Sequence, residues 1–198
     1  EIRMCHASSS QIFGRVDELP ATPDTPVRPI NPYAISKAAA HWLVSQYRRC
    51  HGLKVCSGIL FNHESHLRPT DFFVKKVIHT AVRIARGKAK ELRVGNLNVR
   101  RDFGYAPKYV EALWLMLQQH EQKDYCICSG FSVELSWIVR FVFDYLELDM
   151  KKVVVDADFC RPDDIADIYG DNGPAERDLG WEYSISAEEL LRTLIEEE

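Results

Sequence analysis

The sequence predicts an α/β protein, because short apolar segments alternate along the chain with longer segments of helical periodicity. Residues 2–7 and 54–61 read as buried strands, and residues 31–52 read as the helix between them. Polar residues follow both strands, with Ser9 soon after the first and Asn62 directly after the second. Open parallel sheets bind ligands at the carboxyl ends of their strands, so we expect a site at this edge.

Composition and charge narrow the classes of function. The 198 residues, 46% of them hydrophobic, suffice for a sizeable core and for one or two domains. A formal net charge of -4 and a pI near 6.0 give no reason to expect a nucleic-acid or membrane partner. No apolar run approaches the roughly 20 residues of a membrane span, and the first residues lack a signal-peptide pattern. The simplest expected location is the cytoplasm.

The cysteines read as reduced, small hydrophobic residues. They are dispersed, mostly among apolar neighbours, and none forms a Cys-x-x-Cys pair, so we expect neither a metal site nor a redox role. The six are Cys5, Cys50, Cys56, Cys126, Cys128 and Cys160.

The central helix begins with a phenol and an ammonium group one turn apart. Asn31 suits the N-cap and Pro32 the first helical position, so Tyr33 and Lys37 share a face. A phenol with a pKa of about 10 is a poor base at neutral pH unless a nearby cation stabilises the phenolate. Lys37 can supply that cation. Taken alone, the pair more often belongs to a helix that merely contains both residue types.

Other elements follow in order along the chain. Residues 15–32, with a proline at every third position from Pro20, predict a lid-like loop beside the site; a polyproline docking segment is the alternative. An amphipathic helix is predicted at 71–86. We expect its basic face to be solvated, with nucleic-acid binding as the alternative, and the first turn of the helix can help to hold a sugar-nucleotide diphosphate. Further strands are predicted at 92–94, 125–129 and 153–155, and helices at 109–120, 135–146 and after the Ser186/Glu189 capping box.

Several segments together carry a resemblance to a known family. The Ser-rich turn at 7–14, about two dozen residues before Tyr33-x-x-x-Lys37, resembles the extended short-chain dehydrogenase/reductase family. Within it, Gly-Ile-Leu-Phe-Asn-His-Glu-Ser at 58–65 and Arg-Asp-Phe-Gly at 101–104 closely resemble the GDP-mannose 4,6-dehydratases. So do Gly95-Asn96 and residues 113–119, and the likeness runs from about residue 2 to the end.

This resemblance implies the latter half of a Rossmann-like parallel sheet with a smaller α/β substrate-binding part. Residues 1–68 correspond to the second half of the Rossmann-like domain. Residues 69–198 correspond mainly to the substrate-binding part, with about 100–130 returning to the sheet. The chain contains no G-x-G-x-x-G or G-x-x-G-x-x-G turn to cradle a dinucleotide pyrophosphate. We therefore expect the C-terminal portion of a longer enzyme; a short form unable to hold the cofactor alone is the alternative.

The resemblance also implies an NADP-linked conversion of GDP-mannose to a 4-keto-6-deoxy sugar. In that reaction ionised Tyr33 takes the proton of the sugar 4-hydroxyl. Lys37 lowers the pKa of Tyr33 and hydrogen-bonds the nicotinamide ribose. Ser9 stands where the family has Thr and keeps the hydroxyl that hydrogen-bonds the 4-oxygen.

Gln11 departs from the family pattern, which has Glu there as the base that removes the C5 proton. An amide has no useful basicity, and general-base catalysis is typically worth about 10²- to 10⁴-fold. The open alternatives are a dehydratase with another base, for which Glu64 is the nearest candidate, a reductase or epimerase, and a non-catalytic or regulatory homologue. Gln11 can also simply fill the turn before Ile12.

Cofactor and substrate contacts are implied position by position. His63 and Arg68 match NADP contacts of the family, and Asn62, Arg101 and Arg161 match positions that meet the substrate diphosphate or nucleotide. Residues that differ from the family around Arg68 also alter one of two arginines that help subunits pack. A homo-oligomer, a dimer or tetramer, is expected by resemblance alone.

Overall fold

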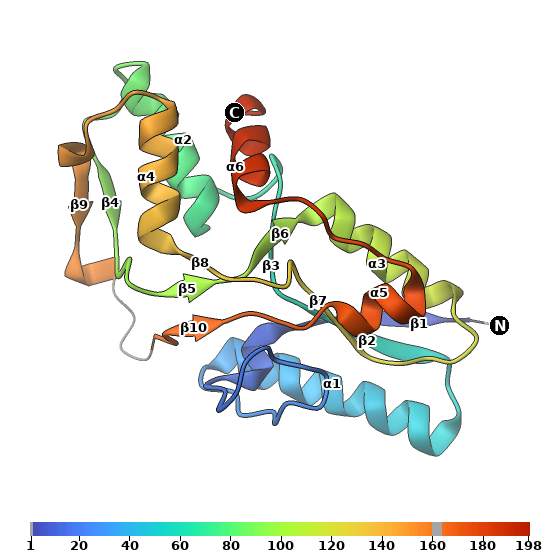
Figure 1. The fold of residues 1–198 in the computed structure, drawn as a ribbon. Coiled ribbons are helices and arrows are strands. Elements are labelled where there is room, and N and C mark those ends of the chain that lie inside the picture. The colour runs from blue at the N-terminus through green and yellow to red at the C-terminus, as the bar shows by residue number, and fades with distance from the viewer. Residues whose placement is uncertain (1, 160–163) are drawn as a thin grey trace.

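The computed structural model describes residues 2–159 and 164–198, and it confirms the predicted α/β class (Figure 1). Three parallel strands form one sheet in the order β1-β2-β7, with β1 at Met4–Ser9, β2 at Val55–Leu60 and β7 at Tyr125–Ile127. In the register of β1 and β2, Met4 lies opposite Val55 and Ser9 lies opposite Leu60. The two strands therefore end together, and the polar residues that follow them start from one edge.

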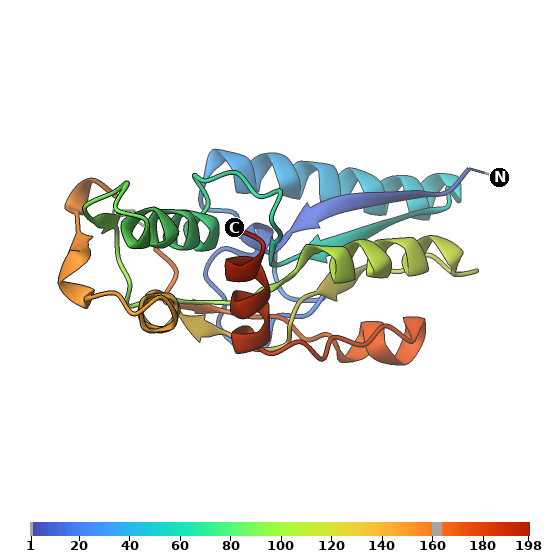
Figure 2. The ribbon, with the colours of Figure 1, turned by 90° about the horizontal axis from the view of Figure 1, so that it is seen from above.

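Helices cover both faces of this sheet. Helix α1 (Pro32–His51) packs on one face, while α3 (Ala106–Gln118) and α5 (Gly173–Leu179) pack on the other (Figure 2). Side chains alternate between two cores, as strand geometry requires: Ile59 joins the core under α1, and Cys56 joins the core under α3. Gly58 allows α3 to approach closely, because a Cβ there would lie 2.4 Å from Leu113 Cδ2.

A second group of elements forms its own core at the other end of the molecule (Figure 1). Helices α2 (Phe73–Ala85), α4 (Leu135–Tyr145) and α6 (Ala187–Glu196) pack together, and α2 also contacts β4 (Leu92–Val94), which pairs in parallel with β9 (Val153–Val155). The domain division at about residue 68 remains a prediction.

Short strands connect these two groups. Strand β3 (Asn62–Glu64) pairs in parallel with β6 (Phe103–Tyr105). Strand β5 (Arg100–Arg101) pairs in parallel with β10 (Asp167–Ile168) and antiparallel with β8 (Val133–Glu134). Three 3-10 turns complete the described elements: η1 (Ser10–Phe13), η2 (Met150–Lys152) and η3 (Ala157–Phe159).

The local signals for helix ends behave as predicted at α1 and α6. Asn31 Oδ1 accepts a hydrogen bond from the backbone of Ala34 at 2.8 Å, and α1 ends at Gly52 with a φ of 64°. The Ser186/Glu189 capping box begins α6. Helix α3 begins three residues before the predicted Tyr109, because Pro107 occupies its first turn, where a missing N–H costs nothing. Within the described residues, no helix is both long and apolar enough to cross a membrane.

Candidate active site

Ser9 and Gln11 lie where β1 ends and the η1 turn begins. Ser9 is buried, and its Oγ accepts a hydrogen bond from the Gln11 backbone at 3.3 Å. The turn closes on Gly14, whose φ of 58° suits glycine and where a Cβ would lie 2.0 Å from the Arg28 carbonyl oxygen. Gln11 is partly buried, and its Oε1 accepts a hydrogen bond from Asn31 Nδ2 at 3.2 Å. The N-cap residue of α1 therefore also holds the Gln11 side chain.

Tyr33 and Lys37 occupy the first two turns of α1, as predicted. The Tyr33 side chain is half exposed, and Lys37 Nζ lies 5.8 Å from the centroid of its ring. Lys37 Nζ also donates a hydrogen bond to the Ala7 carbonyl oxygen at 2.8 Å. Since Ala7 lies two residues before Ser9, this bond ties the ammonium group to the strand end that carries Ser9. The structure thus brings Ser9, Tyr33 and Lys37 to one edge of the sheet.

Asn62 and His63 continue from β2 into β3 at the same edge. Asn62 Nδ2 donates to the Asp102 carbonyl oxygen at 2.8 Å. His63 Nδ1 lies 2.8 Å from the Phe61 carbonyl oxygen, which can only accept, so Nδ1 carries the proton and Nε2 remains an acceptor. The His63 ring packs against Tyr109 with centroids 5.4 Å apart. Burial, the largest effect, lowers the pKa of His63 and so favours the neutral ring.

Arg68 is held between a carboxylate and an aromatic ring. Its Nε lies 3.4 Å from Glu64 Oε2, and its guanidinium carbon lies 3.7 Å from the centroid of Phe72. Neither Nε nor Oε2 makes a well-aligned hydrogen bond among the described residues. Glu64 is only 2% exposed, and burial raises its pKa to about 7, although the Arg68 cation opposes this shift.

Arg101 points toward the segment that precedes β10. Its guanidinium donates to the Ile165 carbonyl oxygen at 2.6 Å and to Asp164 Oδ1 at 2.8 Å. Arg161, the remaining residue expected to contact substrate, lies outside the described residues.

Asp102 is a buried acceptor that our sequence reasoning missed. The residue is fully buried, and Oδ1 accepts hydrogen bonds from the backbone and hydroxyl of Ser129 at 2.9 and 2.8 Å and lies 3.5 Å from the Tyr109 hydroxyl. Oδ2 accepts from the backbones of Gly130 at 3.3 Å and Gly170 at 3.4 Å. Burial outweighs these bonds and raises the pKa of Asp102 to about 6. Its place in the Arg-Asp-Phe-Gly motif was the available signal.

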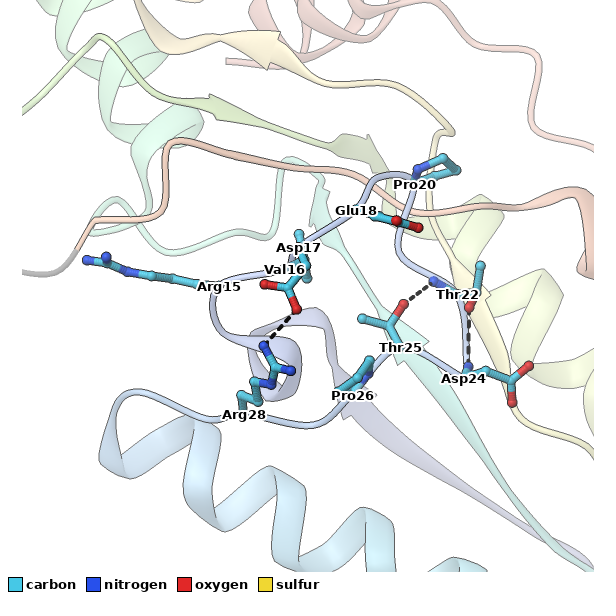
Figure 3. Close-up of a pocket in the computed structure, with 10 residues that line it drawn as sticks. All are labelled: Arg15, Val16, Asp17, Glu18, Pro20, Thr22, Asp24, Thr25, Pro26 and Arg28. Atoms are coloured by element: carbon cyan, nitrogen blue, oxygen red, sulfur yellow. Dashed lines mark hydrogen bonds and ion pairs between the residues drawn. The ribbon is translucent and has the colours of Figure 1, made fainter.

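A surface cavity of about 400 Å³ lies within the loop at 15–28 (Figure 3). Arg28 crosses this loop and donates to Asp17 Oδ2 at 2.9 Å, and both side chains are exposed. No residue that we expected in the site lines this cavity, so the lid-like role of the loop remains a prediction. Outside residues 1 and 160–163, no cluster of three or more His, Cys, Asp or Glu side chains is arranged to hold a metal ion.

The sequence of this chain is similar to those of known proteins. A family model described as GDP-mannose 4,6 dehydratase matches residues 1–194. GDP-mannose 4,6 dehydratase 1 of Arabidopsis thaliana is 38% identical over 198 residues, which are 100% of this chain and 55% of that protein. GDP-mannose 4,6 dehydratase of Dictyostelium discoideum is 32% identical, over 98% of this chain and 60% of its own length. The chain thus spans little more than half of these relatives.

Solved structures share the fold. RMD from Pseudomonas aeruginosa, complexed with NADPH, superposes with a TM-score of 0.88 and 26% identity over 98% of this chain and 65% of its own. The dTDP-glucose 4,6-dehydratase of Bacillus anthracis, in complex with NAD, gives a TM-score of 0.89 at 17% identity, over 98% and 61%. At that identity the second match shows the fold alone.

Proposed function

Because this chain belongs to the GDP-mannose 4,6-dehydratase family, we propose that it forms the catalytic and substrate-binding part of an NADP-linked enzyme converting GDP-mannose to a 4-keto-6-deoxy sugar. The observation that carries the proposal is the bond from Lys37 Nζ to the Ala7 carbonyl oxygen at 2.8 Å. This bond holds the cation at the strand end that presents Ser9 and one helical turn from Tyr33.

These three residues have complementary roles in the proposed reaction. Tyr33 removes the proton of a substrate hydroxyl, and its half-exposed side chain can reach a ligand. Lys37 Nζ lies 5.8 Å from the centroid of the Tyr33 ring, which places an ammonium group beside the phenol. The Ser9 hydroxyl orients the substrate oxygen. The bond to Ala7 already fixes the Lys37 ammonium, which reduces the ordering needed when substrate binds.

The residues at the sheet edge suit a nicotinamide cofactor. Lys37, His63 and Arg68 would hold it, and when bound it would accept and return the hydride of the reaction. The bond at His63 Nδ1 leaves Nε2 as an acceptor for a ligand, and Arg68 supplies a cation that Glu64 and Phe72 hold in place. The RMD structure was solved with NADPH. NADP is therefore the form that we propose.

Substrate recognition falls to residues on β3 and β5. The Asn62 amide is fixed by its bond to the Asp102 carbonyl oxygen, which leaves the Asn62 carbonyl oxygen for a ligand. The Arg101 guanidinium is planar and matches phosphate oxygens, and its bonds to the Ile165 carbonyl oxygen and Asp164 Oδ1 hold it beside β10. We propose that both residues, together with Arg161, bind the nucleotide diphosphate.

A non-catalytic sugar-nucleotide-binding homologue is the second candidate function, and Gln11 is the observation that favours it. The Gln11 amide is held by Asn31 and cannot accept a proton at neutral pH. Glu64 is buried against Arg68, so its carboxylate is engaged rather than presented to a substrate. A family member that only reduces or epimerises its substrate is also compatible with Gln11, because hydride transfer needs Tyr33 and Lys37 and no C5 base.

We propose that the chain forms a homo-oligomer through the outward face of α1. Its outward face carries exposed apolar side chains at helical spacing, and their exposed fractions are 55% for Ile35, 54% for Trp42, 58% for Leu43 and 50% for Tyr47. Burying such a stripe against another copy would remove it from water. Light scattering of the wild type and of Trp42→Glu tests this: a shift of the variant to lower mass supports the interface, and an unchanged mass contradicts it.

Ligand-dependent thermal unfolding of the 198-residue chain tests the proposed function. At a hundred times its dissociation constant, GDP-mannose should stabilise the folded state by about 2.7 kcal/mol, whereas UDP-glucose should not. Arg101→Met should abolish that shift, and Arg93→Met, which changes an exposed arginine on β4, should preserve it. The absence of any shift with GDP-mannose, with or without NADP, would contradict both candidate functions.

Exchange of the C5 proton then separates the two candidates. In the complete protein with NADP and GDP-mannose in D₂O, Gln11→Glu should raise deuterium incorporation at C5 by about 10²-fold or more, the usual scale of general-base catalysis. Gln11→Asn is the matched control without a carboxylate. If binding is intact and Gln11→Glu gives no exchange, the dehydratase proposal is wrong, and a binding role or a reductase or epimerase of the family remains.

A further inference from the structure

Two cysteines face each other across neighbouring strands of the central sheet. The parallel register of β1 and β2 pairs Cys5 with Cys56. Neighbouring strands lie about 4.8 Å apart, and a disulfide joins Cα atoms that are about 4.4–6.8 Å apart. Both side chains lie on the α3 face of the sheet, because Cys5 packs against the same core that contains Cys56, Ala112 and Met116.

The two thiols differ in their surroundings, which gives them different chemistry. Cys56 is fully buried, and its Sγ lies 3.8 Å from the Met4 carbonyl oxygen. Cys5 lies on β1, which in the described part of the sheet has only β2 as a neighbour, and its side chain is partly exposed. The neighbouring Cys56 thiol lowers the pKa of Cys5, although burial opposes this shift, whereas the Cys5 thiol and burial together raise the pKa of Cys56. Cys5 is therefore the thiol that an oxidant meets first.

We propose that Cys5 and Cys56 are a thiol pair that closes to a reversible disulfide between β1 and β2. The oxidant is a low-molecular-weight disulfide such as oxidised glutathione. The Cys5 thiolate attacks one of its sulfurs, the glutathione S–S bond breaks, and one glutathione thiolate leaves and takes up a proton. Cys56 then attacks the Cys5 sulfur of the mixed disulfide, and its proton goes to the second departing glutathione. Two protein thiols are oxidised and one small disulfide is reduced to two thiols.

The position of this pair gives the bond a consequence for the candidate site. Strand β1 ends at Ser9, and β2 leads through Phe61 to Asn62. A covalent bond between the strands fixes their register at the end remote from these residues. It also closes the loop that contains α1, and cross-links that close long loops restrict the unfolded chain. The oxidised protein should therefore unfold at a higher temperature than the reduced protein.

Peptide mapping after equilibration of the folded chain in glutathione buffers tests the proposal. Trypsin separates the two residues into fragments 4–15 and 55–75, each with one cysteine. In oxidising buffer we expect the two fragments to be recovered joined, with a mass two hydrogen atoms below the sum of their separate masses. In excess reduced glutathione we expect them to be recovered separately. Melting should be shifted upward only in the oxidised sample.

Two variants make the outcome specific. Cys5→Ser removes the partly exposed thiol and should abolish both the joined fragments and the upward shift. Cys50→Ser removes the exposed cysteine of α1 and should change neither. The peptide mapping uses wild-type protein, so the test does not depend on a variant of the buried Cys56, which could fail to fold. The proposal would be overturned if the reaction ended with a mixed disulfide between Cys5 and glutathione. It would also be overturned if the joined fragments formed only in denaturant.

Discussion

Replacement of Asp102 by Asn tests whether a buried charge governs the pH dependence of stability. The carboxyl group is fully buried, and burial raises its pKa from the usual 3.8 to about 6. A raised pKa means that the folded state holds the proton more tightly than the unfolded state does. The stability from this group is therefore fully present below pH 3.8 and is lost as the pH rises through about 6.

The magnitude follows from the two pKa values. The wild type should have a free energy of unfolding about 1.3 kcal/mol larger at pH 5 than at pH 7 because of Asp102 alone. Asp102→Asn removes this contribution at every pH. At pH 7 the variant no longer buries a charge, which favours folding by about 3 kcal/mol. However, the Asn amide N–H group can face the N–H groups of Gly130 and Gly170, and each buried donor left without an acceptor costs about 1–3 kcal/mol. These effects nearly cancel, so the pH dependence is the informative quantity.

Urea unfolding followed by far-UV circular dichroism at pH 5, 6 and 7 measures this difference. The difference in free energy of unfolding between the wild type and Asp102→Asn should fall by about 1.3 kcal/mol from pH 5 to pH 7. Asp144→Asn, at an exposed position of α4, is the matched control and should follow the wild type. Equal pH slopes for the wild type and Asp102→Asn would show that the Asp102 pKa is not raised.

Three further predictions concern stability and are measured by the same unfolding assay. Burial raises the pKa of Glu64 from 4.5 to about 7, so the wild type should lose about 2.5 kcal/mol relative to Glu64→Gln between pH 5 and pH 8; parallel curves would contradict this. Asp124→Asn breaks the bidentate pair with Arg48, whose side chains are 13% and 23% exposed, and should cost about 2–3 kcal/mol, whereas a loss below about 0.5 would indicate a solvated pair. Ser186→Ala removes the α6 N-cap and should cost about 1 kcal/mol; an unchanged midpoint would show that the cap adds nothing.

Local signals were enough to predict the longer helices and the strands of the central sheet, together with the one-turn spacing of Tyr33 and Lys37. The Asn31 cap, the Tyr33 and Lys37 spacing and the Ser186 capping box are all decided within one or two helical turns, where backbone geometry dominates. The alternation of apolar and helical segments gave the α/β class, and the family resemblance gave the Rossmann-like arrangement. Helix α5 was not predicted from periodicity, since seven residues are too few to show a hydrophobic repeat.

The interactions that fix Asp102 could not be predicted from the sequence. Its donors come from Ser129, Gly130 and Gly170, which are 27, 28 and 68 residues away. Two of the three are backbone groups of glycines, which have no side chain to signal a role. The Cys5 and Cys56 pair was missed for a similar reason, because only the strand register places them opposite each other. Long-range register and backbone donors leave little trace in local patterns.

Asn31 links Gln11, which departs from the family pattern, to Tyr33 and Lys37, which match it. Its Oδ1 caps the helix that carries Tyr33 and Lys37, while its Nδ2 donates to Gln11 at 3.2 Å. An amide N–H donates equally well to a carboxylate, so the site already supplies a partner for Glu at position 11. Gln11→Glu should therefore leave the α1 cap and the melting temperature unchanged. Since the geometry around position 11 suits either residue, the base alone separates this chain from its family's pattern there.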